Sequence, residues 1–391
     1  MSLYRILTLL LLLLITDTNA SENKKQNLKV SYLKLTVAAP ATLSSMVTPP
    51  QDSGQQGAVL AVNDANTTGK FVNQQIILTT DILQSPEQII QTLKERYASG
   101  HRIFLINADK DALRSLQQWA SDKQVLLFNI AATADILRKS WCDKNTLHTA
   151  LSDSMKTDAL AQWLLAKRLT KVLVVHGRFA KDLTIVSAFE RSAKRYGLKL
   201  IEKKQWDFNA DLRRSAAREM PLFTQTAREY DVVFIADAIK DFADYLPYNT
   251  YLPRPVIGSA GAQALGWHAR IEQWGALQLQ NRFNALANRP MNETDFAGYV
   301  ALRSVSSAFL STKSSQVDTL KEYIQSANFG LGAYLGRKLT YRQWNGQLRM
   351  PISILHPTAL ISQSPQQGIL HPTNELDTLG FEKAESGCRF N

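Results

Sequence analysis

Short apolar runs alternate with longer amphipathic stretches through the first 260 residues of this 391-residue chain. The expected strands cover residues 28–35, 75–79, 102–107, 125–129, 171–176, 198–203, 231–236 and 255–258. The expected helices between them cover residues 55–66, 85–99, 110–120, 155–169, 182–196 and 212–229. Strands that alternate with helices form parallel sheets with helices on both faces. Because the rhythm pauses after residue 129 and restarts at 155, the sequence predicts an α/β protein with two doubly wound lobes and a boundary near residue 150.

The last third of the chain departs from this rhythm. Long helices are expected over residues 269–288 and 293–310, and a shorter helix over 316–326. The Asn345-Gly346 pair between two strand-like runs predicts a β-hairpin within residues 338–353. Beyond Pro357 the composition is typical of a loosely held tail.

The first 20 residues have the three parts of a cleavable export signal. Arg5 precedes an apolar run over residues 7–15, and Thr18-Asn19-Ala20 ends in a small residue suited to cleavage. The run is shorter than the roughly 20 residues that span a bilayer. We therefore expect residues 1–20 to be removed, which leaves a soluble, exported protein that begins near Ser21. The absence of a cysteine after the cleavage site argues against a lipid anchor.

The chain contains two cysteines, Cys142 and Cys388, and both lie beyond the export signal. Exported proteins reside where disulfides form and persist, so one Cys142–Cys388 bond is the simplest expectation. Such a bond would tie the tail, residues 357–391, back to the middle of the chain. The tail is therefore expected to be held in place despite its composition.

The net charge of +11 is compatible with a nucleic-acid, membrane or small anionic partner. No nucleic-acid-binding motif is present, so nucleic acid is not expected. The basic residues are spread along the chain, which is typical of a solvated surface and equally allows a positive pocket. Neither a metal-binding pair of histidines nor a nucleophile elbow, dinucleotide fingerprint or phosphate loop occurs. The sequence therefore proposes no enzyme, no metal and no required cofactor.

Candidate ligand-binding residues follow the predicted strands, because ligands of open α/β sheets bind at the carboxyl ends of the strands. These candidates are Ala131, Ala132, Thr133, Arg138, Trp141, Arg178, Lys181, Asp237, Ser259 and Trp267. Their cations suit carboxylates, and tryptophan offers a flat face for stacking. Each has a structural alternative: Trp141 as a plug beside the disulfide, Trp267 as helix packing at the hinge, and Asp237 as a helix cap.

Taken together, these features resemble the type I periplasmic binding proteins of the branched-chain amino-acid-binding kind. Residues 57–66 resemble that group's first helix, and Ala131-Ala132-Thr133 its ligand-holding turn. A closer resemblance is to the substrate-binding family of ABC transporters associated with pyrroloquinoline quinone (PQQ)-dependent alcohol dehydrogenase systems. The segments that carry it are 137–142, 145–149, 158–162, 251–255, 273–275, 342–349, 375–380 and 385–388.

This resemblance implies two Rossmann-like lobes joined by three crossovers, with a ligand held in the cleft between them. The first lobe would combine residues 28–148 with 262–337, and the second 149–261 with 338–356, followed by the tail at 357–391. The implied protein is a periplasmic monomer that closes around its ligand and delivers it to an ABC permease in the inner membrane.

Three functions follow from these observations. The first is binding of a small anion, PQQ itself or a compound of that pathway. The second is import of a branched-chain amino acid or an alcohol-oxidation product. Amino-acid binders hold the ligand's ammonium with an acidic residue of the second lobe, and Ser259-Ala260-Gly261 offers none, which argues against a simple amino acid. The third is ligand-free docking on a dehydrogenase or a sensor, with the long tail as the docking element.

Overall fold

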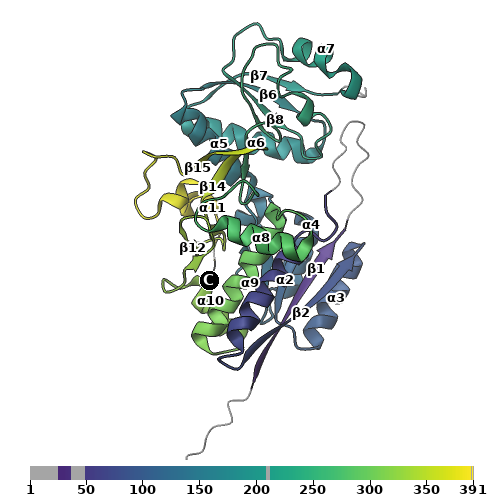
Figure 1. The fold of residues 1–391 in the computed structure, drawn as a ribbon, viewed down its shortest axis with the longest axis vertical. Coiled ribbons are helices and arrows are strands. Elements are labelled where there is room, and N and C mark those ends of the chain that lie inside the picture. The colour runs from purple at the N-terminus through teal and green to yellow at the C-terminus, as the bar shows by residue number, and fades with distance from the viewer. Residues whose placement is uncertain (1–24, 37–48, 208–211, 389, 391) are drawn as a thin grey trace, which may run out of the picture.

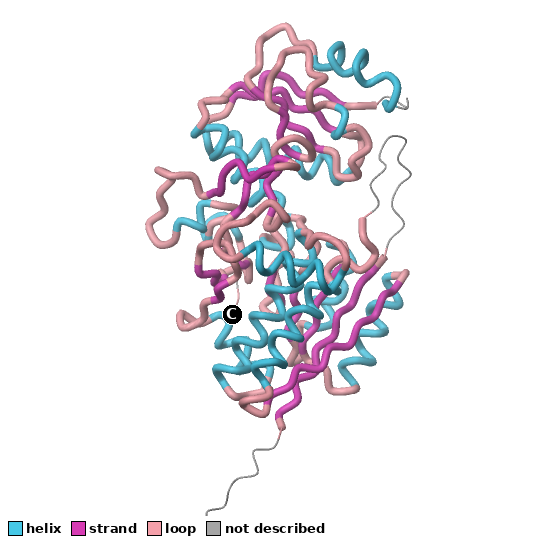
Figure 2. The backbone as a smooth tube through the Cα atoms, viewed as in Figure 1, coloured by secondary structure: helices cyan, strands magenta, loops and turns pink. Residues whose placement is uncertain are grey.

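The computed structural model describes residues 25–36, 49–207, 212–388 and 390. The predicted export signal at residues 1–20 lies outside this part. The molecule is elongated, with two lobes stacked along its long axis (Figure 1). Each lobe has its own group of strands, as Figure 2 shows, and a third, smaller group lies between them. No helix among the described residues is long and apolar enough to cross a membrane.

The first lobe is built on a five-stranded sheet in the order β2-β1-β3-β4-β5, in which all neighbours are parallel. Its strands are β1 (Gln26–Leu35), β2 (Gln74–Leu83), β3 (Ile103–Asn107), β4 (Leu126–Asn129) and β5 (Thr146–His148). Apolar side chains of α3 (Pro86–Ala98) and α4 (Lys110–Ala120) pack on one face. Those of α2 (Gln55–Gly69) and α9 (Glu293–Thr312) cover the other face.

The second lobe has a four-stranded parallel sheet in the order β7-β6-β8-β9. Its strands are β6 (Lys171–His176), β7 (Lys199–Gln205), β8 (Val232–Ala236) and β9 (Val256–Gly258). Helices α5 (Asp153–Ala166) and α6 (Ala180–Tyr196) share a core with one face, and α7 (Leu212–Thr224) covers the other. The two doubly wound lobes confirm the predicted fold class.

Two of the predicted helices in the last third lie close to their expected ranges, α9 and α10 (Val317–Gln325). The remaining one, α8 (Ala276–Ala287), begins seven residues later than the expected start at residue 269. Trp274 and Gly275 have φ of +56° and +80°, so the chain cannot continue a right-handed helix through them.

The predicted hairpin is present as β12 (Lys338–Tyr341) and β13 (Leu348–Arg349), and β11 (Leu331–Gly332) pairs with β12. We expected it in the second lobe, but Gln347 forms a parallel bridge with His148, which places the hairpin beside the edge of the first sheet. Gly346 explains this approach. A Cβ atom at residue 346 would lie 2.4 Å from the carbonyl oxygen of Thr146, so only glycine allows the hairpin so close.

The tail is ordered rather than loose. Residues expected to be irregular form β15 (Ala359–Ser364), which joins β10 (Gln263–Leu265) and β14 (Ile352–His356) in an antiparallel sheet, and this sheet lies against α5. The chain then forms the short turn η3 (Glu375–Thr378) and α11 (Lys383–Ser386). A Cys142–Cys388 disulfide follows, with Cα atoms 5.8 Å apart. The predicted disulfide and the predicted pinning of the tail are both confirmed.

Candidate ligand-binding cleft

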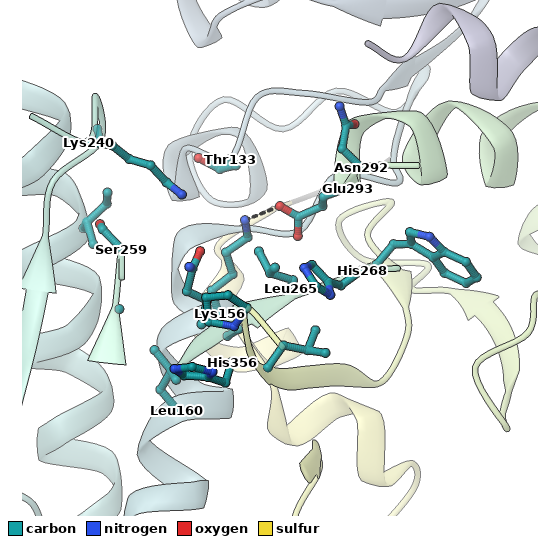
Figure 3. A pocket seen from close by; sticks show the side chains of 18 of the residues that line it. Thr133, Lys156, Leu160, Lys240, Ser259, Leu265, His268, Asn292, Glu293 and His356 are labelled. Atoms are coloured by element: carbon teal, nitrogen blue, oxygen red, sulfur yellow. Dashed lines mark hydrogen bonds and ion pairs between the residues drawn. The ribbon is translucent and has the colours of Figure 1, made fainter. Parts of the chain in front are cut away.

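A cleft of about 850 Å³ lies where the carboxyl ends of both sheets meet helices α5, α6 and α9 and the small antiparallel sheet. Its polar lining comes mainly from Thr133, Asp153, Lys156, Lys181, Asp237, Lys240, Ser259, His268, Arg270, Asn292, Glu293 and His356. This volume is within the range of small-molecule sites, and the position is where ligands of open α/β sheets bind. Figure 3 shows several of these side chains around one common space.

Lys181, in the first turn of α6, links the two lobes across the cleft. Its Nζ atom donates to Oγ1 of Thr133, which follows β4, and to Oδ2 of Asp153 at the start of α5, each over 2.6 Å. The charge of Lys181 is therefore already balanced by a carboxylate.

A second ion pair joins α5 to α9. Lys156 Nζ lies 2.5 Å from Oε2 of Glu293 (Figure 3). The Gly266 N–H donates to the other carboxylate oxygen over 2.9 Å. Glu293 follows the helix N-cap residue Asn292, where the helix dipole favours a negative charge. Both charges of this pair are engaged.

Asp237 lines the cleft, but its carboxylate serves the backbone. Oδ2 accepts the N–H groups of Phe242 and Ala243 over 2.8 and 2.9 Å. Burial raises the pKa of this carboxyl group. The Asp237 N–H donates to Oγ of Ser259 over 2.9 Å. This arrangement matches the capping role that was the structural alternative for Asp237.

Two cations of the cleft have no such balance. Among the described residues, neither the Lys240 ammonium nor the Arg270 guanidinium has a hydrogen-bond or ion-pair partner, and both line the cleft. Lys240 follows β8 by four residues, and its side chain extends into the space beside Thr133 and Lys156 (Figure 3). Two cations in the described lining of the cleft therefore have no ion-pair partner there.

Two imidazoles also belong to the polar lining. His268 Nδ1 accepts the Arg270 N–H over 3.2 Å, and burial, followed by the nearby Arg270 charge, lowers the pKa of His268. A neutral His268 leaves Nε2–H available as a donor. His356 Nδ1 lies 3.1 Å from the hydroxyl of Thr358. Within the described ranges, no group of three His, Cys, Asp or Glu residues is arranged to hold a metal ion.

Five of the ten predicted site residues line this cleft: Thr133, Lys181, Asp237, Ser259 and Trp267. Trp267 is only 1% exposed, its ring stacks on Phe296 with centroids 4.6 Å apart, and its Nε1–H donates to Gln280 over 3.2 Å. Its indole thus packs within the core, which matches the structural alternative stated for it.

The other five predicted residues, Ala131, Ala132, Arg138, Trp141 and Arg178, do not line the cleft. The side chain of Asn129 holds the turn at 131–132, because its Oδ1 atom accepts the N–H groups of both alanines. Arg138 is buried, and its guanidinium donates to Gln347 and to the carbonyls of Ala132, Ala134 and Ala150. Burial lowers the pKa of Arg138 to about 10.

Trp141 packs against the apolar cluster beneath α3 and α4, with Lys110 Nζ 5.4 Å from its ring centroid. It is the plug beside the disulfide that was its alternative role. Arg178 borders a separate small hollow with Asp207 and Asp241, and its guanidinium lies 5.6 Å from the Phe179 ring centroid.

Of the twelve polar lining residues named above, sequence reasoning missed eight: Asp153, Lys156, Lys240, His268, Arg270, Asn292, Glu293 and His356. Lys240 had a usable signal, because it follows a predicted strand as the chosen candidates do. Lys156 and Glu293 are 137 positions apart, and no local pattern announces that they form a pair.

We compared the chain with protein-family models, with curated sequences and with solved structures. Residues 34–220 match the family model described as periplasmic binding protein. A search of curated protein sequences finds no significant match. Many solved structures are similar, among them a branched-chain amino-acid ABC transporter periplasmic ligand-binding protein from Burkholderia xenovorans. It has a TM-score of 0.73 and 15% identity, and the match covers 92% of this chain and 99% of that chain.

A leucine-, isoleucine-, valine-, threonine- and alanine-binding protein from Brucella ovis, in a closed conformation, is similar with a TM-score of 0.67, 15% identity and coverage of 92% and 96%. A solute-binding protein of an ABC transporter from Rhodopseudomonas palustris, in complex with benzoate, has a TM-score of 0.64, 15% identity and coverage of 86% and 95%. At such identities the likeness shows the fold. The family match over residues 34–220 and these similar structures confirm the predicted type I periplasmic-binding-protein fold.

Proposed function

We propose that this protein is the substrate-binding component of an ABC-type transport system, and that its cleft binds a small carboxylate anion that has no ammonium group. One observation carries the proposal. Each carboxylate that lines the cleft is engaged by protein groups, whereas Lys240 and Arg270 have no partner among the described residues. The role is binding and delivery without a chemical step.

The charge balance separates two ligand classes. An amino-acid ligand brings an ammonium, which would have to displace Lys181 from Asp153 or Lys156 from Glu293. A ligand with carboxylates alone meets Lys240 and Arg270 without disturbing either pair, through charge-assisted hydrogen bonds. The similar Rhodopseudomonas palustris protein is in complex with benzoate, a ligand of this second class.

PQQ is the first ligand to test. It is a flat quinone with three carboxylates, and the chain resembles the binding proteins associated with PQQ-dependent alcohol oxidation. The cleft volume of about 850 Å³ accommodates a molecule of this size. Because the indoles of Trp141 and Trp267 are used in packing, the proposed contacts to the ring come from the imidazoles of His268 and His356 instead.

A thermal-shift screen of the mature protein tests the proposal, because a ligand that binds the folded state raises the apparent melting temperature. The panel contains PQQ, benzoate, acetate as a product of alcohol oxidation, and leucine. We expect PQQ or another carboxylate to raise the melting temperature while leucine does not. A shift with leucine alone would favour the amino-acid function, and no shift with any compound would favour ligand-free docking.

The Lys240→Met variant locates the binding site, and Lys194→Met is its matched control. Lys194 is an exposed lysine of the same lobe that lies outside the cleft. We expect Lys240→Met to reduce the ligand-induced shift and Lys194→Met to preserve it. Equal shifts in both variants would contradict binding at this cleft.

A further inference from the structure

The C-terminal segment, residues 375–388, is attached to the first lobe at its end. Cys388 is bonded to Cys142, which lies in the loop after β4. Two residues earlier, Ser386 Oγ donates to the carbonyl oxygen of Arg138 over 3.0 Å. The far end of this segment is therefore fixed to the first lobe by a covalent bond and a hydrogen bond.

The middle of the same segment is attached to the second lobe through α6. Arg191 Nη2 lies 2.9 Å from Glu385, and Arg195 Nη2 lies 2.5 Å from Glu382. Both arginines also donate to the carbonyl oxygen of Gly380 over 3.0 Å. These two arginines therefore grip the segment at three acceptors.

A buried carboxylate of α5 strengthens this grip. Asp158 accepts the Gly380 N–H over 2.7 Å and forms ion pairs with Arg191 and Arg195. The start of the segment is fixed as well, because Asp377 pairs with Arg342 and Arg349 of the hairpin beside the first sheet. The segment thus runs between the lobes with attachments on each, along the side where they meet (Figure 1).

Helix α6 connects these attachments to the cleft. Lys181 in its first turn lines the cleft, whereas Arg191 and Arg195 near its end hold the segment. Lys181 and Arg195 are 14 positions apart on this helix, a distance of about 21 Å at 1.5 Å per residue. Because the helix is a stiff element, a rotation that moves the cleft wall also moves the segment's attachment.

We propose that residues 375–388 form an interlobe strap, which restrains the rotation of the second lobe relative to the first and thereby slows opening of the cleft. Hinge motion between two lobes is the usual way in which such clefts admit and release a ligand. The strap must shear or stretch when α6 moves relative to the loop that contains Cys142. The effect on ligand release rests on the proposed function, whereas the restraint on the lobes does not.

Two variants loosen the strap's attachments to different lobes. The first is Cys142→Ser with Cys388→Ser, which removes the covalent attachment to the first lobe. The second is Glu382→Gln with Glu385→Gln, which weakens the grip of α6 and leaves the buried Asp158 paired. The matched control is Glu190→Gln, because Glu190 also lies on α6 but pairs with Lys203 outside the strap.

Small-angle X-ray scattering and hydrogen–deuterium exchange on the ligand-free mature protein measure the restraint directly. We expect both strap variants to show a larger radius of gyration and faster exchange in the crossover at 149–152, while Glu190→Gln matches the parent. A purely stabilising tail would lower the melting temperature without changing either quantity. Unchanged scattering and exchange in a folded Glu382→Gln, Glu385→Gln variant overturn the proposal, even if the cysteine variant does not fold.

Stopped-flow fluorescence with PQQ as the probe measures the consequence for the cleft. We expect PQQ to dissociate several-fold faster from the strap variants than from the parent and the control. Equal dissociation rates would refute the link between the strap and the cleft. If PQQ gives no signal with any of the proteins, the proposed ligand is wrong, and the scattering result still decides whether the strap restrains the lobes.

Discussion

The cleft and the C-terminal segment are both rich in charged side chains, but they use these charges differently. In the C-terminal region, fully buried Asp158 faces Arg191 and Arg195, and Asp377 faces Arg342 and Arg349. In the cleft, Lys240 and Arg270 have no partner among the described residues. A buried charge must be paired to be tolerated, whereas a cation in an open cleft is solvated until a ligand replaces the water. Paired charges therefore stabilise the structure around the C-terminal segment, whereas the unpaired cations of the cleft belong to the proposed binding site.

We expect the largest loss of stability when a buried ion pair is broken. Asp377→Ala would leave Arg342, whose side chain is 1% exposed, without its carboxylate. Breaking a buried pair by removing one partner costs about 3–5 kcal/mol. Urea unfolding followed by circular dichroism would measure this loss. The control is Asp122→Ala, which removes an exposed pair with Lys123 and should cost at most about 1 kcal/mol. Similar losses in the two variants would show that burial does not distinguish them.

The covalent end of the strap is expected to contribute nearly as much. Replacing Cys142 and Cys388 by serine should lower the free energy of unfolding by about 2–5 kcal/mol, because the bond closes a loop between residues 246 positions apart. The measurement is the urea midpoint of the parent and the variant, each with and without a reductant. Only the parent should respond to the reductant. A parent that does not respond would show that the bond contributes nothing to stability.

The unbalanced cations should matter for affinity and little for folding. Each charge-assisted hydrogen bond contributes about 1.5–3 kcal/mol, so Lys240→Met or Arg270→Met should weaken carboxylate binding about 10- to 100-fold. Calorimetric titration at two salt concentrations would test this, because removing a cation also reduces the salt dependence. Urea unfolding should be nearly unchanged. Loss of stability with unchanged affinity would reverse the assignment of structure and binding.

The smallest expected effect is a change in the pH dependence of stability, which results from the buried imidazole of His148. Burial lowers the pKa of His148 well below its usual value, with a smaller effect from Arg138. His148 therefore binds a proton near pH 6.5 in the unfolded chain but stays neutral at that pH in the folded protein. The contribution of neutral His148 to the free energy of unfolding is fully present above pH 6.5. It is lost as the pH falls below this value, by up to about 1.4 kcal/mol per pH unit.

The His148→Gln variant isolates this contribution. Its free energy of unfolding should depend less steeply on pH between about 6.5 and 5 than that of the parent. Part of the slope should remain, because the pKa values of His101 and His268 are also lowered. Identical slopes would show that His148 titrates alike in the folded and unfolded states.

Most of the fold follows from local patterns. Strand β6 (171–176) lies where the apolar run predicted it, and Ser85 and Gly197 begin and end their helices as their cap chemistry indicates. The elements that were missed depend on partners outside the segment itself. Strand β5 is three residues long and is completed by β4, and β15 exists because it pairs with β14. Nothing within these segments signals such pairing.

The candidate site was less predictable for the same reason. The rule that ligands bind at the carboxyl ends of strands found Thr133, Lys181 and Ser259. It does not say whether a side chain points into the cleft or back into the protein, as Arg138 and Trp267 do. Which cations remain unbalanced depends on contacts such as Lys156 with Glu293, which only the folded chain brings together.

The Cys142–Cys388 bond also means that the state of the Cys142 thiol reports whether a chain extends to residue 388. Cys142 emerges during synthesis long before its partner, and the chain contains no other cysteine with which it can pair. A chain cut short before residue 388 therefore carries a free thiol at Cys142, whereas a chain that reaches residue 388 and folds hides that thiol in the bond. A thiol-reactive dye would thus distinguish complete, folded molecules from truncated ones in a single measurement on a purified sample.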